Sequence, residues 1–182
     1  MRLIDAWPTF INPRRGDICR IALDQRNQLR TVGSTGSTGM KLHAKDVAAA
    51  MNDIAALLNR SDTTVAVVGA TDNPHKYGSV IYRDLKHKGF TVYPVNPTRD
   101  TVDGDKAYAS LAALPEKPTV VNIVVPPEAT LQVLEGALHN GLTNVWVQPG
   151  AESPEVLAFL QEHGFNYLAH ACIMIESRMM SG

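Results

Sequence analysis

A loop bounded by glycines carries the clearest chemistry in the chain, Gly69-Ala-Thr-Asp-Asn-Pro-His-Lys-Tyr-Gly78. It follows a short apolar run and opens a helical pattern, so backbone N–H groups and the positive end of the helix dipole could bind an anion there. Gly69 permits a sharp turn, Gly78 lets the helix approach the sheet, and Lys76 adds a positive charge. We therefore predict a phosphate site, against the alternative that both glycines serve only tight packing.

The kind of phosphate compound is narrowed by motifs that are missing. The dinucleotide fingerprint GxGxxG is absent, because the two glycines of the loop are separated by eight residues. A dehydrogenase also places an acid after its second strand to bind the ribose, whereas this chain has Asn96 in Pro94-Val-Asn-Pro97. NAD is therefore disfavoured. The P-loop pattern with Gly-Lys-Ser/Thr is absent too, which argues against an NTPase.

The elements that must position this loop follow from hydrophobic periodicity. Strand and helix patterns alternate about five times, which predicts an α/β fold, a Rossmann-like doubly wound parallel sheet with helices on both faces. The predicted strands are 64–68, 90–95, a short element near 107–108, 119–125, 144–147 and 165–169, and the predicted helices are 45–59, 77–88, 128–140 and the segment from 153 to Gly164.

The expected strand order is 3-2-1-4-5, with room for a sixth strand. In such a sheet the order reverses between the strand 64–68 and the strand that ends at Val125, so the loops after these two strands should face each other. This crevice is the predicted place of the function.

The chain divides at residue 40. Residues 1–39 are rich in arginine and end in Gly33-Ser-Thr-Gly-Ser-Thr-Gly39, a composition typical of a flexible linker. We interpret 1–39 as an extension that is either non-native or a mis-started segment, with a short hairpin around 18–32 as the alternative. Residues 40–182 are predicted to form the functional domain.

Composition excludes several classes of protein. With 17 basic and 18 acidic residues the chain carries a formal charge of −1, so binding of nucleic acid through bulk charge is not expected. No apolar run is long enough for a membrane span and no secretory signal is apparent, so no membrane partner is expected and the predicted location is the cytoplasm. The two cysteines and six histidines form no metal-binding pattern, so no metal is expected.

Five spaced motifs resemble one family: Val67-Val-Gly-Ala-Thr-Asp-Asn-Pro74, Tyr93-Pro-Val-Asn-Pro97, Val124-Val-Pro-Pro-Glu128, Val145-Trp-Val-Gln-Pro-Gly150 and Cys172-Ile-Met-Ile-Glu176. In this order they resemble the small stand-alone CoA-binding proteins, whose domain is similar to the N-terminal CoA-binding domain of the succinyl-CoA synthetase α subunit. The resemblance covers about residues 45–178. It implies that coenzyme A lies across the crevice.

The resemblance also implies which residues touch the ligand. The loop would contact the CoA phosphates, Asn96 and Pro97 would flank the nucleotide, and Arg99 matches a basic position that reaches a CoA phosphate. Val125, Pro126 and Pro127 would form an apolar wall, and Val147, Gln148 and Pro149 would close the opposite side of the site. The implied cofactor-binding residues are Gly69, Ala70, Thr71, Asp72, Asn73, Lys76, Tyr77, Gly78, Asn96, Pro97, Arg99, Val125, Pro126, Pro127, Val147, Gln148 and Pro149.

Catalytic residues do not stand out. No Ser-His-Asp order, nucleophile elbow or paired carboxylates is present, and the synthetase owes its chemistry to a further domain and a partner subunit. We therefore expect a protein that binds CoA or an acyl-CoA without catalysis, such as a sensor, and keep an NAD(P)- or other nucleotide-dependent Rossmann enzyme as the alternative. A mixed disulfide between Cys172 and CoA is a further hypothesis, because Cys172 follows the last strand. The oligomeric state is left open.

Overall fold

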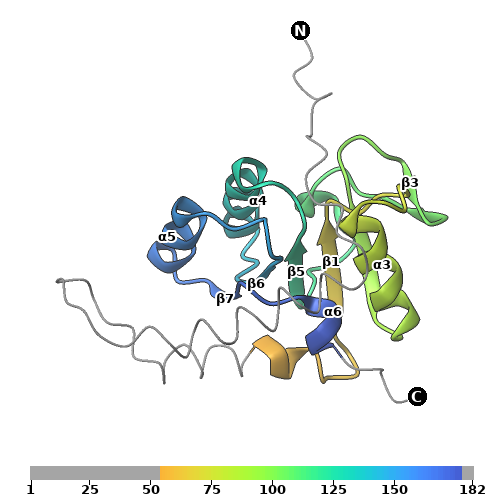
Figure 1. Cartoon of the computed structure of the whole chain (residues 1–182), viewed down its shortest axis with the longest axis horizontal. Coiled ribbons are helices and arrows are strands. Elements are labelled where there is room, and N and C mark those ends of the chain that lie inside the picture. The colour runs from red at the N-terminus through yellow and green to blue at the C-terminus, as the bar shows by residue number, and fades with distance from the viewer. Residues whose placement is uncertain (1–53, 178–182) are drawn as a thin grey trace, which may run out of the picture.

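A parallel sheet of five strands forms the centre of the molecule (Figure 1). The computed structural model describes residues 54–177, so the predicted linker and most of the predicted helix 45–59 lie outside the described residues. The strands are β1 Thr64–Val68, β2 Thr91–Val95, β5 Val120–Ile123, β6 Asn144–Val147 and β7 Asn166–Leu168. Each lies within a predicted strand, because runs of β-branched and apolar residues suit a strand that is covered on both faces.

The strand order is β2-β1-β5-β6-β7, with every neighbouring pair parallel. The predicted short element near residue 108 is present as a single parallel bridge beside β2. In this bridge Tyr108 N–H donates to Pro94 O, and Asn96 N–H donates to Tyr108 O. With this bridge as the third strand the order is 3-2-1-4-5-6, as predicted. The reversal between β1 and β5 is confirmed.

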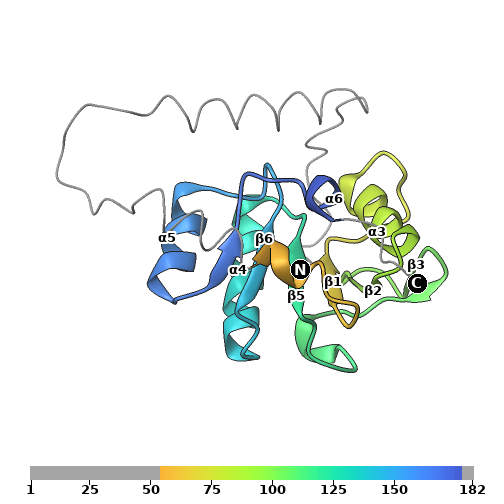
Figure 2. The same cartoon turned by 90° about the horizontal axis from the view of Figure 1, so that it is seen from below.

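Helices cover both faces of the sheet, as predicted (Figures 1 and 2). On one face, α4 Pro127–His139 and α5 Pro154–Glu162 pack on alternate strand residues such as Val121 and Ile123. On the other face, α3 Tyr77–His87 and the short α6 Ile173–Glu176 cover Val67 and Trp146. Two cores on opposite sides therefore fix the plane of the sheet and the position of its carboxyl edge.

Helix starts follow the chemistry of their first residues. The Ser153 hydroxyl accepts the N–H of Val156 at 3.2 Å and Pro154 follows it, which is the cap arrangement expected from the sequence. Pro127 is the first residue of α4, one position before the predicted start, since its missing N–H costs nothing there. None of the helices in the described part of the chain is long and apolar enough to span a membrane.

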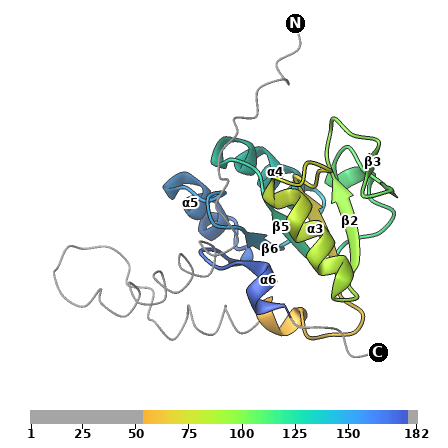
Figure 3. The same cartoon turned by 45° about the vertical axis from the view of Figure 1, so that its right-hand side comes forward.

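A small antiparallel hairpin that the sequence analysis missed stands at the carboxyl end of β2 (Figure 3). It consists of β3 Thr101–Val102 and β4 Asp105–Lys106. The turn between them, Asp103-Gly104, has φ values of +52° and +81°. This is the two-residue turn that an Asp-Gly pair favours, so a local signal for the hairpin was present.

Candidate functional site

The turn after β1 brings two loops into contact at the carboxyl edge of the sheet. Gly69 has a φ of +98°, which side chains rarely adopt. A Cβ at this position would lie 2.9 Å from Val125 Cγ1 and 3.2 Å from Val124 O, both in the loop after β5. The loops after β1 and β5 therefore face each other across the switch point, as predicted.

The first turn of α3 is pressed against the end of β1. A Cβ on Gly78 would lie 2.0 Å from Gly69 O and 2.9 Å from Gly69 C, so no side chain fits. Tight packing thus explains Gly78 by itself. The same contact places the N-terminal end of α3, with its positive dipole, at the carboxyl end of β1, which is the geometry of an anion site.

Hydrogen bonds between residues two positions apart shape the loop between these glycines. The Thr71 hydroxyl accepts the N–H of Asn73 at 3.3 Å, and Asn73 Oδ1 accepts the N–H of His75 at 3.0 Å. Lys76 is the N-cap residue of α3, and its side chain makes no capping hydrogen bond. Ala70 and Thr71 are buried, whereas Asn73 is exposed. A ligand could therefore reach the part of the loop that begins at Asn73 more easily than the part before it.

Asn96 connects the loop after β2 to the loop after β1. Its Nδ2 donates to Ala70 O at 2.7 Å, and its Oδ1 accepts from the N–H of Thr98 at 2.9 Å. The side chain that stands where a dehydrogenase has its ribose-binding acid is therefore a neutral structural bridge. Pro97 beside it is exposed.

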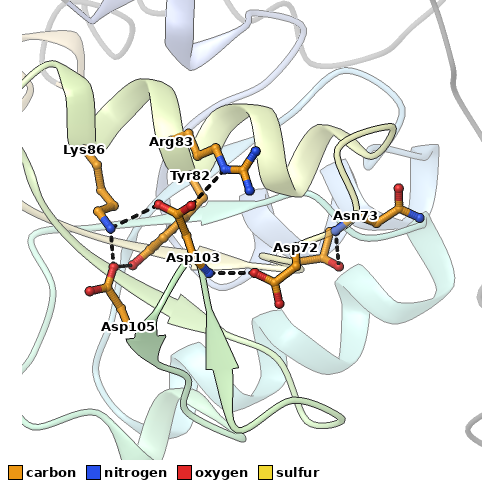
Figure 4. A network of polar contacts seen from close by, with 8 residues as sticks. Asp72, Asn73, Tyr82, Arg83, Lys86, Asp103 and Asp105 are labelled. Atoms are coloured by element: carbon orange, nitrogen blue, oxygen red, sulfur yellow. Dashed lines mark hydrogen bonds and ion pairs between the residues drawn. The ribbon is translucent and has the colours of Figure 1, made fainter.

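Asp72 joins the same loop to Arg99 and to the hairpin. Arg99 Nη1 donates to Asp72 Oδ2 at 3.2 Å. The N–H of Asp103 donates to Asp72 Oδ1 at 2.6 Å (Figure 4). The structure thus brings Arg99 to the loop that it was predicted to assist. Its guanidinium lies against a carboxylate, a contact over 27 residues of sequence that the pattern did not reveal.

The opposite side of the crevice is more buried than expected. Val125 and Val147 are 2% and 0% exposed and belong to the core under α4 and α5, so their side chains point into the protein. Pro126, Pro127 and Pro149 are partly exposed. An apolar wall at this position would consist of the prolines and the backbone.

A buried amide pair lies beside this wall. Gln148, 4% exposed, donates from Nε2 to Asn122 Oδ1 at 2.7 Å. Asn122 is fully buried in β5, and its Nδ2 has no hydrogen-bond partner among the described residues. Sequence reasoning missed Asn122, although a lone amide inside the apolar run 119–125 was a visible signal.

His170 and Cys172 follow β7 at the carboxyl edge of the sheet. Cys172 is 5% exposed, and burial raises the pKa of its thiol. His170 instead pairs with Glu152, with 3.1 Å between His170 Nδ1 and Glu152 Oε1. Within residues 54–177 no group of three His, Cys, Asp or Glu side chains could hold a metal ion.

The strand order and the helices on both faces define the chain as an α/β protein of the Rossmann-like class, with the loops after β1 and β5 meeting at its switch point. The model of the CoA binding domain family matches residues 63–178, which is nearly all of the described domain. The chain belongs to this family.

Relatives divide into small proteins and large ligases. The chain is 46% identical to a conserved hypothetical protein of Pyrococcus furiosus, with a TM-score of 0.62, over 63% of this chain and 99% of that one. It is 30% identical to the uncharacterized protein YneT of Bacillus subtilis, over 68% of this chain and 90% of YneT. It is 29% identical to the α subunit of an ADP-forming acetate–CoA ligase of Pyrococcus furiosus, over 61% of this chain. The match spans only 27% of that subunit.

Proposed function

We propose that this protein binds coenzyme A, or an acyl-CoA, across the carboxyl edge of its sheet and acts as a binding or sensor protein without catalysis. The observation that carries the proposal is the contact of Gly78 with Gly69. It holds the N-terminal end of α3 at the end of β1, inside a domain that matches the CoA binding family along its length.

The residues around this contact suit the chemistry of CoA. Lys76 and Arg99 supply positive charge for the phosphates near the N-terminal end of α3. The prolines at 126, 127 and 149 offer an apolar surface to the pantetheine arm. Asn122 Nδ2, buried and unpaired among the described residues, is an additional donor near this wall.

Absence of catalysis is the second part of the proposal. His170 is engaged by Glu152 and Cys172 is buried with a raised pKa, so neither supports a nucleophile at neutral pH. The ligase relatives carry this domain as a small part of a larger chain. The alternative, an NAD(P)-dependent enzyme, is not favoured, because Asn96 stands in place of the ribose-binding acid. Its side-chain amide donates a hydrogen bond to Ala70 O instead.

Thermal unfolding with CoA, acetyl-CoA, NAD, NADP and ATP tests the ligand. A ligand at about 100 times its Kd adds roughly 2.7 kcal/mol to the free energy of unfolding, which shifts the midpoint measurably. We expect a shift with CoA and acetyl-CoA only. A shift with NAD instead would refute the proposal, and release of free thiol from acetyl-CoA at a turnover rate would refute its non-catalytic part.

A charge reversal localises the binding to the loop. Lys76→Glu removes a positive charge at the start of α3, so we expect weaker CoA binding in titration calorimetry. Lys117→Glu makes the same change in an exposed residue shortly before β5, at the opposite edge of the sheet. Equal loss of affinity in both variants would show that CoA does not bind at the loop.

A further inference from the structure

The carboxylate of Asp72 lies where the loops after β1 and β2 meet the hairpin. We propose that Asp72 determines nucleotide specificity in this site: its fixed negative charge competes with a ribose phosphate of the ligand for Arg99, and so limits the preference for a 3′-phosphorylated nucleotide. This inference rests on the proposed function, the binding of CoA.

Asp72 is held in place by the hairpin independently of any ligand. Its Oδ1 accepts the N–H of Asp103 at 2.6 Å. The Asp103 carboxylate in turn accepts from Arg83 at 3.0 Å and from Lys86 at 3.2 Å, both on α3 (Figure 4). Asp105 completes the attachment by accepting from the Tyr82 hydroxyl at 2.7 Å. The position of the Asp72 charge is therefore set by α3 and the hairpin.

Arg99 is the partner that can move. Its side chain is 39% exposed, and within residues 54–177 its one hydrogen bond or ion pair is the single contact of Nη1 with Asp72 at 3.2 Å. An exposed ion pair of this kind is weak, because water screens both charges. A phosphate offers Arg99 more charge and two oxygens for a bidentate contact, so a phosphate displaces Asp72 from the guanidinium.

The place of this pair indicates which phosphate is involved. Arg99 follows the end of β2 and the Asn96-Pro97 turn. In Rossmann folds an arginine near the end of the second strand takes a phosphate on the ribose, whereas the diphosphate lies at the first helix. CoA carries a ribose 3′-phosphate and dephospho-CoA does not. A comparison of these two ligands therefore separates the contact of Arg99 with the 3′-phosphate from contacts with the diphosphate.

Asp72 remains beside the phosphate after Arg99 has turned to it, because the hairpin still holds the carboxylate. The phosphate and the Asp72 carboxylate are then two negative groups close to each other, and their repulsion lowers the affinity for the phosphorylated ligand. Without the 3′-phosphate, Arg99 stays paired with Asp72 and no such cost arises. Neutralising Asp72 should therefore favour CoA over dephospho-CoA.

Titration calorimetry of CoA and dephospho-CoA on four proteins tests the inference. Asp72→Asn keeps an oxygen that can accept the Asp103 N–H and removes only the charge. We expect the preference for CoA over dephospho-CoA, as the ratio of their Kd values, to rise about three- to tenfold in this variant. Arg99→Gln leaves the charge of Asp72 and its attachment to the hairpin intact, so it should remove the preference for CoA over dephospho-CoA or reverse it.

The matched control is a second exposed Arg–Asp pair at the other end of β1. Arg60 Nη2 and Asp62 Oδ2 lie 2.7 Å apart, and both side chains are exposed just before the strand. Asp62→Asn removes the same charge there and should leave the ratio unchanged. If the unsubstituted protein binds CoA and Asp72→Asn leaves the ratio unchanged, the role of Asp72 is refuted while CoA binding stands. If the unsubstituted protein binds neither ligand, the proposed function fails and this inference fails with it.

Discussion

The α-carbon of Gly78 leaves no room for a methyl group, since a Cβ would lie 2.0 Å from the backbone oxygen of Gly69. Gly78→Ala must push α3 away from β1 or distort both, and overpacking of this kind costs about 2 to 3 kcal/mol. We expect urea unfolding to report this loss in the free energy of unfolding. Because this substitution also moves the N-terminal end of α3 away from β1, CoA affinity should fall in the same variant.

Gly136 supplies the matched control for that substitution. It lies inside α4, and a Cβ there would meet nothing within 4 Å. Gly136→Ala should therefore raise the free energy of unfolding by about 0.5 to 1 kcal/mol, because alanine favours the helix and glycine does not. Equal effects at the two positions would contradict the close approach of α3 to β1.

Single residues also show what the sequence could and could not predict. Gly69 and Gly78 were identified from the pattern because a strand, a loop and a helix follow one another within a short stretch. Arg99 was identified only through the family resemblance. Its pairing with Asp72, and the burial of Val125, Val147 and Cys172, depend on how distant segments pack, which no local pattern encodes.

At the scale of elements, the strands and helices were largely predictable, and the hairpin was not recognised. Apolar runs of about four residues, such as residues 65–68, predict buried strands because both faces of the sheet are covered. Strands β3 and β4 have two residues each, too few to show alternation. The Asp103-Gly104 pair was their one local signal, and the contacts that hold the hairpin come from α3.

One of the contacts that attach the hairpin to α3 comes from a phenol. The Tyr82 hydroxyl donates to Asp105 at 2.7 Å, and burial together with this bond raises the pKa of Tyr82. Tyr82→Phe removes a hydrogen bond to a charged group, worth about 1.5 to 3 kcal/mol, so amide exchange at Asp103 should become faster. Tyr167→Phe, which removes an exposed phenol bonded to Gln161, should leave that exchange rate unchanged.

The loops after β6 and β7 are joined by a pair that depends on pH. The hydrogen bond with Glu152 raises the pKa of His170 above its usual 6.5. Burial alone would raise the pKa of Glu152, but bonds from His170 and from the Gly150 N–H hold it below its usual 4.5. The His170 contribution to stability is lost as pH rises through its raised pKa, and the Glu152 contribution is lost as pH falls through its lowered pKa.

Stabilisation by this pair should therefore be greatest between about pH 4.5 and 6.5. His170→Asn suits the φ of +61° at this position, because asparagine tolerates that conformation. Because His170 is about half exposed, we expect a coupling with Glu152→Gln of less than about 1 kcal/mol near pH 5.5, and still less at pH 8.5. Double-mutant cycles by urea unfolding at both pH values measure it, and equal coupling at both would refute the assignment.

At the scale of the whole molecule, the described residues 54–177 build two hydrophobic cores, one on each face of the sheet. The first core residue described is Ile54, which is fully buried with Leu58 against α3 and Trp146. The sequence predicts that residues 1–39 are an extension, so a chain that begins at Met40 should unfold at the same temperature as the full chain and bind CoA with the same Kd. A chain that begins at Asp62 loses both Ile54 and Leu58, and each buried aliphatic side chain contributes about 1.5 to 3 kcal/mol. Its unfolding midpoint should be clearly lower, and an equal loss in the chain from Met40 would show that residues 1–39 belong to the folded domain.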